Sequence, residues 1–436
     1  MAKSEQNKSK SNFIEEKFLP VAARIGSQRH LIAMRDGIVM VMPLLILGAF
    51  AMIIAEFPFQ PYLDFMARTF GEDWLAFEGI IMNATYGIVA IVACFGVCSS
   101  LVSSYGIDGT PAGIISLSAF FTINVVSAFE TADGTVEAWL TGTFTAEFLF
   151  TALLVALASG EIYRLLVQKK FTIKLPASVP GAVSRQFTAL LPGVVIILLF
   201  TVLHFLFAVT PWGSFPEFVS VVISTPLRGA GTSYIGTVLG CIVEHILWAL
   251  GLHGSSIIIF PIFEPMWVMN LQDNIANAAG HIVTQPFYEN GVWIGGSGCT
   301  LPVVVYMLVF AKSKLLKQVG KLGIGPGLFN INEPVTFGLP IVLNPILMIP
   351  FILTPVAVMT VQYFGTAIGL FPLCNYMVPW TTPVFISGFL MTGSLMGVVA
   401  QIVSFVVAFF IWLPFIRAWD KTNYKMEQEA EIAAAE

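Results

Sequence analysis

Long apolar runs separated by short polar stretches dominate this chain. A membrane-spanning helix needs about 20 predominantly apolar residues. Ten such segments fit between the polar stretches, near residues 31–55, 80–103, 110–129, 141–163, 186–210, 235–252, 255–272, 292–311, 340–368 and 385–416. These runs exceed typical globular helices, and they lack the period-two alternation of membrane β-strands. The pattern therefore predicts an all-α polytopic membrane protein with about ten transmembrane helices.

Three segments in the second part of the chain differ from ordinary spans because glycine and proline interrupt them. They are "GLHGSSIIIFPIFEP", "YENGVWIGGSGCTLP" and "GIGPGLFNINEPVTFGLP". Non-helical backbone at membrane depth is tolerated only where protein buries it or where it lines a wet cavity. Broken segments of this kind point to the substrate site of a transporter. We therefore expect re-entrant hairpins near residues 253–300 and 325–340.

Charged residues between the spans predict the topology. Positive residues gather in four groups: Arg24, Arg29 and Arg35; Arg164, Lys169, Lys170, Lys174 and Arg185; Lys312, Lys314, Lys317 and Lys321; and Arg417, Lys421 and Lys425. The positive-inside rule places these groups in the cytoplasm, so ten spans leave both termini cytoplasmic and the acidic loop around Glu130 outside. The basic linker divides the chain into two subdomains. The predicted organisation is a cytoplasmic segment 1–30, a first half 31–185, a second half 186–416 and a cytoplasmic tail 417–436.

Composition supports the membrane prediction and narrows the chemistry. Of the 436 residues, 56% are apolar and only 11% are charged, against roughly 25% charged in a typical soluble protein. No basic face suggests a nucleic-acid partner. The five cysteines form no close CxxC pair, so neither a metal site nor a disulfide framework is predicted. Nucleotide-binding, HExxH and Gly-x-Ser-x-Gly motifs are also missing from the sequence, which disfavours a membrane hydrolase. We expect no cofactor and no metal.

Glu333, in "FNINEPVTFGLP", is the only Asp, Glu, Lys or Arg between Lys321 and Arg417. A carboxylate before Pro334 would suit a helix N-terminus. Placing a charge at mid-bilayer costs roughly 2.5–3.5 kcal/mol, however, so intramembrane acids tend to face a functional cavity. Glu333 is therefore predicted to accept hydrogen bonds from a polar ligand inside the membrane.

His253 follows a predicted span in "LWALGLHGSS". An imidazole can donate and accept hydrogen bonds near neutral pH, which suits sugar hydroxyls, although a buried packing histidine would fit the pattern equally well. Trp248 and Trp380 are either interfacial aromatics or ring platforms for the apolar face of a sugar.

The motif "NINEPVTFGLPIVLNP" resembles the signature of the membrane-embedded IIC component of bacterial sugar phosphotransferase systems, in the lactose, cellobiose and diacetylchitobiose family. "LHGS" and "GGSGCTLP" precede it in the same order, and the similarity covers nearly the whole chain. The resemblance implies that Glu333 and His253 contact the sugar and act on its reacting hydroxyl. Further sugar-lining positions implied by the resemblance are Asn332, Trp248, Trp380, Glu78 and Gly79. Glu78 departs from the amide expected at its position.

The resemblance also implies a function and a set of partners. Such a protein binds an external disaccharide, carries it across the bacterial cell membrane and presents it to a phosphocysteine on a IIB protein. No residue of this chain is expected to be phosphorylated. The tail 417–436 is short for a phosphocarrier domain, so separate IIB and IIA proteins are expected. A homodimer through the first five helices is also implied. The rival hypothesis is an ion-coupled disaccharide symporter with Glu333 as its proton carrier.

Overall fold

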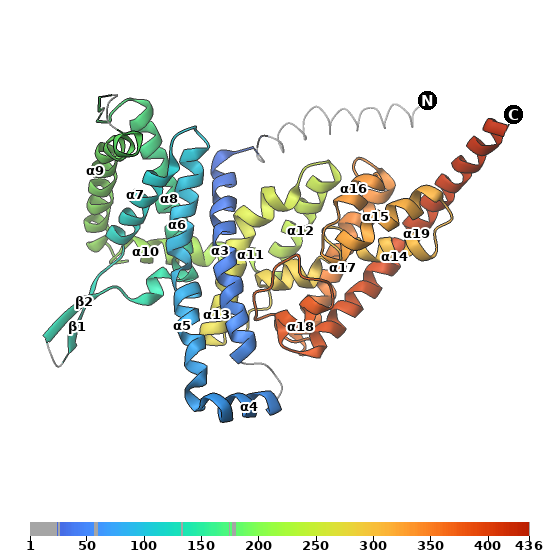
Figure 1. Ribbon diagram of the computed structural model, residues 1–436, viewed down its shortest axis with the longest axis horizontal. Helices are drawn as coiled ribbons and strands as arrows, with labels where there is room; N and C mark the ends of the chain where they lie inside the picture. Colours follow the sequence, from blue (N-terminus) through green and yellow to red (C-terminus); the bar gives the residue numbers. More distant parts are fainter. Residues whose placement is uncertain are drawn as a thin grey trace.

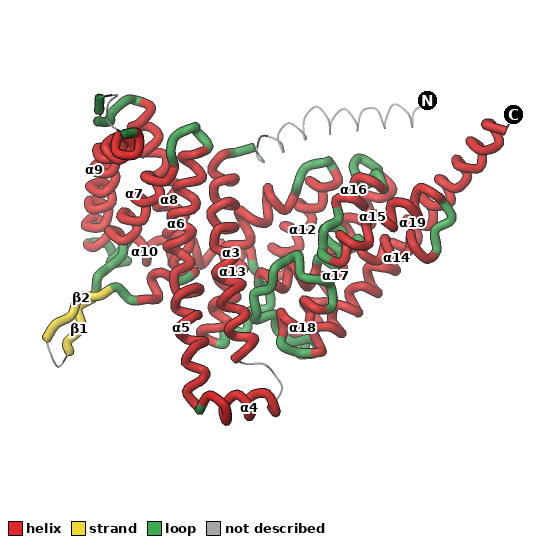
Figure 2. The backbone as a smooth tube through the Cα atoms, viewed as in Figure 1, coloured by secondary structure: helices red, strands yellow, loops and turns green. Residues whose placement is uncertain are grey.

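The computed structural model describes residues 24, 27–55, 60–131, 134–173, 175–176 and 180–435. Most of the predicted N-terminal segment 1–30 therefore lies outside the described residues. The longer helices are α3 (Arg29–Ala55), α4 (Gln60–Phe70), α5 (Ala76–Thr85), α6 (Val89–Ser103), α7 (Gly109–Ile123), α8 (Leu149–Gln168), α9 (Gly181–Ala208), α12 (Tyr234–Ala249), α13 (Glu264–Asn277), α14 (Leu301–Val309), α15 (Lys314–Leu328), α17 (Pro345–Ala367) and α19 (Leu395–Ala435). Helices dominate the molecule, so the predicted all-α membrane class is confirmed (Figures 1 and 2).

Six of the described helices are long and apolar enough to cross a membrane, or seven if a bent pair counts as one span. The bent pair joins residues Phe215–Gly231 to α12 at an angle of 73°. α7 is apolar but shorter, with 15 residues. The count of ten spans stays a prediction.

Helices α3, α7 and α8 pack around α6, which lies at the centre of one hydrophobic core, and α9 packs against α7 and α8. Ala90, Ala93, Cys94, Val97 and Cys98 are all buried along α6. Small residues let helix backbones approach closely in membranes, where packing rather than water exclusion drives helix association. The two cysteines act here as small packing residues within this core.

Gly37 lies where α3 and α6 approach each other closely. A Cβ atom added at Gly37 would lie 2.6 Å from the backbone nitrogen of Val97 and 2.9 Å from its Cα. Gly37→Ala is therefore expected to force the two helices apart and destabilise the protein by about 1–3 kcal/mol. Thermal melting of the purified protein measures the effect. Gly325→Ala is the matched control, because a Cβ added at Gly325 of α15 meets nothing within 4 Å. Equal melting temperatures for the two variants would contradict the close packing of α3 on α6 at Gly37.

Short strands replace the end of one predicted span. The span predicted at 110–129 ends at Ile123, and β1 (Ser127–Thr131) pairs antiparallel with β2 (Gly134–Ala138). Asn124 ends α7 by adopting extended backbone, and its side-chain Nδ2 donates to the carbonyl of Phe120 at 2.8 Å. Most residues of this hairpin are exposed, and it projects away from the helices at the lower left of the view in Figure 1.

The second part of the chain contains the broken segments. Residues Ser255–Phe263 form a π-helix (η7) that continues into α13, and Phe287–Val292 form a second one (η8). The span predicted at 292–311 contains only the nine-residue helix α14, preceded by a glycine-rich loop. The span predicted at 385–416 breaks at Gly393 (φ 63°), between α18 (Ile386–Thr392) and α19. Glycine and proline at these positions divide the apolar runs into shorter elements.

The polar helix α15 was not predicted, and side chains of α19 fix its start. The carboxylate of Asp420 accepts hydrogen bonds from the backbone N–H groups of Lys312 at 3.0 Å and Ser313 at 2.9 Å. Glu427 accepts from the N–H groups of Lys314 at 2.9 Å and Leu315 at 3.0 Å. Negative charges satisfy the free N–H groups and the dipole of a helix N-terminus. α15 leads directly to the loop that carries Glu333.

Candidate functional site

A small pocket brings together most of the residues that the sequence predicted for a sugar site. It is lined by Trp248, His253, Ser255, Phe260, Trp293, Ser297, Asn330, Asn332, Glu333 and Trp380. The lining residues come from α12 and the segment after it, from the loop before α14, from the loop between α15 and α16 with the first residue of α16, and from the loop between α17 and α18. At about 90 Å³ the pocket is below the 300–1,000 Å³ typical of ligand pockets. Its walls must therefore separate to admit a disaccharide.

Two asparagines fix the loop that presents Glu333. Asn330 adopts a left-handed backbone (φ 60°) and accepts the N–H of Gly295 at 2.9 Å, while its Nδ2 donates to the carbonyl of Trp380 at 2.7 Å. Asn332 donates from Nδ2 to the carbonyl of Ser297 at 2.5 Å. Both asparagines are buried. They join three loops and thereby place Glu333 and Trp380 at the same pocket.

Gly296 permits this close approach of the loops. Its φ of +90° is accessible to glycine, and an added Cβ would lie 2.5 Å from the carbonyl oxygen of Asn330. The glycine-rich run "GGSG" is therefore required for loop packing against the "NINEP" segment.

Glu333 is the first residue of the short helix α16 (Glu333–Gly338), and it is exposed. Among the described residues its carboxylate has no hydrogen-bonding side chain or backbone partner, although it interacts electrostatically with His253. Two carboxylate oxygens are thus free to accept hydrogen bonds from a ligand.

His253 has a defined tautomer when it is neutral. Its Nδ1 accepts the backbone N–H of Ser256 at 3.2 Å, so the ring proton lies on Nε2. The imidazole packs against Trp248, with ring centroids 4.3 Å apart. The pocket therefore offers an N–H donor at His253, acceptor oxygens at Glu333 and aromatic faces, the combination that a sugar requires.

A buried carboxylate holds the wall that carries Trp248. Glu244 accepts hydrogen bonds from the hydroxyls of Ser255 at 2.5 Å and Tyr288 at 2.6 Å, and a longer one from Ser297 at 3.4 Å. Ser255 in turn accepts the indole N–H of Trp248 at 3.2 Å. Glu244 is completely buried, so this network fixes the orientation of the tryptophan.

Sequence reasoning missed several members of this pocket. They are Ser255, Phe260, Trp293, Ser297 and Asn330. Ser255, Ser297 and Asn330 could have been found, because they are the polar residues of the motifs "LHGS", "GGSG" and "NINEP". No comparable signal marks Phe260 and Trp293 in the sequence.

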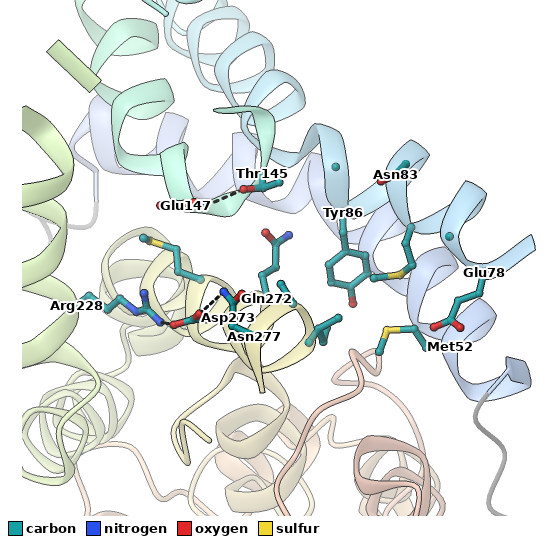
Figure 3. A pocket seen from close by; sticks show the side chains of 16 residues that line it. Met52, Glu78, Asn83, Tyr86, Thr145, Glu147, Arg228, Gln272, Asp273 and Asn277 are labelled. Atoms are coloured by element: carbon teal, nitrogen blue, oxygen red, sulfur yellow. Dashed lines mark hydrogen bonds and ion pairs between the residues drawn. The ribbon is translucent and has the colours of Figure 1, made fainter. Parts of the chain in front are cut away.

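Glu78 and Gly79 lie elsewhere. They line a larger cavity of about 640 Å³ that lies between the first-half helices α3 and α5 and the later helices α11 (Thr225–Gly231) and α13 (Figure 3). The residues predicted together as one sugar site are thus divided between two cavities in this conformation. Among the described residues no group of three or more His, Cys, Asp or Glu side chains could hold a metal ion.

Comparison with known proteins defines the class of this site. Residues 35–355 match the family described as "Phosphotransferase system, EIIC". The chain therefore belongs to the EIIC family of the phosphotransferase system, a family of multi-pass membrane proteins, and the resemblance drawn from the "NINEP" motif is confirmed.

Particular relatives can be named. The lichenan permease IIC component of Bacillus subtilis (strain 168) is 41% identical over 435 residues, covering 97% of this chain and 96% of that protein. The cellobiose-specific EIIC component of Geobacillus stearothermophilus is 41% identical and covers 95% of each chain. The crystal structure of the transporter ChbC, the IIC component from the N,N'-diacetylchitobiose-specific phosphotransferase system, matches with a TM-score of 0.90 and 40% identity, covering 95% of this chain and 99% of that chain.

Proposed function

We propose that this protein is the sugar-translocating IIC subunit for a β-linked disaccharide of the cellobiose type, and that a IIB phosphocysteine phosphorylates the sugar as it arrives. The observation that carries the proposal is the pocket in which Glu333, His253, Trp248 and Trp380 converge. The family match covers the first three of these residues. Relatives named for lichenan and cellobiose support a glucose-based β-linked substrate.

The site chemistry supports specific roles for two residues. Glu333 accepts hydrogen bonds from the sugar hydroxyl that becomes phosphorylated and orients it, and His253 donates from Nε2 to a neighbouring hydroxyl. Transfer itself moves the phosphoryl group from the IIB cysteine to this hydroxyl, whose proton must leave. A carboxylate beside the hydroxyl is placed to accept that proton.

The proposed assembly includes further partners. IIB and IIA act as soluble phosphocarriers, and the chain forms a homodimer through its first half (31–185, or to about residue 210), while residues 186–416 carry the sugar. Both termini are cytoplasmic in this proposal, and the hairpin β1–β2 is external.

Sugar phosphorylation is expected in proteoliposomes that contain this protein and enclose phosphorylated IIB. Cellobiose added outside should accumulate inside as cellobiose phosphate, and vesicles that enclose unphosphorylated IIB are the matched control. Mass spectrometry of the vesicle contents identifies the product. Accumulation of unmodified cellobiose that follows a proton gradient would replace this proposal with the symporter hypothesis.

The topology is tested by labelling from one side of intact cells. Cysteines introduced as Glu130→Cys in β1 and Lys314→Cys in α15 are expected to react on opposite sides of the membrane, because the first lies in the acidic loop and the second in a basic one. The five native cysteines are buried among the described residues and should give little background. Labelling of both positions from the same side would refute the topology.

A further inference from the structure

The larger cavity, of about 640 Å³, has the size of a ligand pocket. Helices α3 and α5 of the first half form one side of it, and α11 and α13 form the other. α5 and α13 reach toward the end of the molecule that carries α4 and the hairpin, which is the predicted external side (Figure 1). The cavity is therefore placed where a sugar would arrive before reaching the smaller pocket at Glu333.

Within the described part of the chain, two buried polar groups that line the cavity have no hydrogen-bond partner. The hydroxyl of Tyr86 is one of them, and its residue is only 5% exposed. The other is Nε2 of Gln272. Gln272 is held in this orientation because its Oε1 accepts the backbone N–H of Ala146 at 2.7 Å. Both side chains point into the space between the helices (Figure 3). A buried polar group left without a partner is destabilising, so a polar ligand in the cavity would gain two favourable hydrogen bonds there.

The remaining lining suits a carbohydrate. Met52, Met82 and Met269 and the ring of Tyr86 provide apolar and polarisable surfaces, which fit the C–H faces of a sugar ring. Asn83 adds an amide at the edge of the cavity, where hydroxyls can donate and accept hydrogen bonds.

The charge of the cavity selects a neutral ligand. Among the described residues that line it, Glu78, Glu147 and Asp273 are acidic, and Arg228 is basic. Asp273, which follows the predicted span 255–272, accepts from Arg228 Nη2 at 2.5 Å. Burial alone would raise the pKa of Asp273, but hydrogen bonds from Asn277, His281 and Arg228 lower it to about 2. Asp273 therefore stays ionised at physiological pH. Carboxylates in excess repel a phosphate group, so the cavity favours a sugar before phosphorylation.

We propose that this cavity is a second, outer binding site for a neutral β-linked oligosaccharide, separate from the pocket at Glu333. The inference rests on the proposed function, because both sites take the same class of sugar. The outer site holds the sugar through hydrogen bonds from Tyr86 and Gln272. In this conformation the inner pocket has a volume of only about 90 Å³, which is smaller than a disaccharide needs.

Calorimetric titration of purified protein with cellobiose separates the two sites. Wild-type protein is expected to show a tight and a weak binding phase, and Glu333→Gln should reduce the tight phase only. Adding Tyr86→Phe to Glu333→Gln should weaken the remaining phase about fivefold or more, since it removes one hydrogen bond to the ligand. Cellobiose 6-phosphate should show no weak phase.

Matched variants separate binding from folding. Tyr86→Phe deletes a hydroxyl that has no hydrogen-bond partner among the residues the structure describes, so the melting temperature should be unchanged. Gln272→Glu keeps an oxygen that accepts the Ala146 N–H but replaces the Nε2 donor by a second oxygen. It should therefore also weaken the weak binding phase. Tyr163→Phe, at another buried tyrosine of the same core, is the control and should leave both phases intact.

Each site can fail separately in this experiment. A tight phase that survives Glu333→Gln would refute the role proposed for Glu333 without affecting the outer site. A weak phase that is missing in wild type, or one that is insensitive to both Tyr86→Phe and Gln272→Glu, would overturn the outer site.

Discussion

Glu333→Gln is expected to lower the affinity for cellobiose by more than tenfold at the inner pocket. The glutamine keeps the size of the side chain but removes the charge and replaces one acceptor oxygen by a donor amide. Hydrogen bonds to charged groups contribute about 1.5–3 kcal/mol each, and about 1.4 kcal/mol corresponds to a factor of ten. The carboxylate is exposed in the pocket, so the loss should appear in binding and not in folding. Calorimetry and thermal melting of the same sample measure both.

The control for this prediction is Glu137→Gln, on the exposed hairpin strand β2. It removes the same charge far from the pocket and should leave affinity unchanged. Wild-type affinity with a lowered melting temperature in Glu333→Gln would show that the carboxylate only stabilises the N-terminus of α16. A symporter would behave differently again, because the variant would bind and exchange sugar but lose its coupling to the proton gradient.

Trp248→Ala and Trp380→Ala are each expected to weaken cellobiose binding by about tenfold or more. Both indoles line the pocket, and burying an aromatic side chain against an apolar surface contributes on the order of 1.5–3 kcal/mol. Trp248 is held in place by the hydrogen bond from its indole N–H to Ser255 and by its contact with His253. Its ring can therefore stack on a sugar with little loss of side-chain entropy.

A phenylalanine variant of Trp380 tests whether the aromatic face itself contributes to binding. Trp380→Phe retains an aromatic face and should recover part of the lost affinity. Trp139→Ala, beside the hairpin and outside the pocket, is the control for loss of an exposed indole. Unchanged affinity in both alanine variants would show that Trp248 and Trp380 only pack against the protein and do not contact the sugar.

The membrane class and the broken segments could be predicted because their causes are local. Apolar runs must be long to span a bilayer, and glycine and proline disturb a helix wherever they occur. The predictions failed where the cause lies outside the local sequence. Nothing in the apolar run 385–416 shows that Gly393 adopts a left-handed backbone and ends α18, because that depends on packing against its neighbours. The polar sequence of α15 gave no apolar signal, and its helix is fixed by Asp420 and Glu427 from about a hundred residues away along the chain.

The candidate site was partly visible in the sequence because unusual chemistry in an apolar context is easy to find. Glu333 and His253 stand out against their neighbours, and the structure places them at one pocket. Asn330 and Ser255 do not stand out, since each acts through partners that only the folded chain brings near. Asn330 joins Gly295 and Trp380, and Ser255 joins Glu244 and Trp248.

The sequence by itself determined that this chain is helical, lies in a membrane and carries the motif of a phosphotransferase EIIC component, because hydrophobic length and motif order are properties of the chain. Tertiary structure decided where each polar group points. It brought Trp380 to Glu333 through two buried asparagines, and it placed Glu78 and Gly79 at a separate cavity with Tyr86 and Gln272. The physical reason is that a polar group inside a membrane protein is positioned by the hydrogen bonds available to it, and those partners come from distant segments.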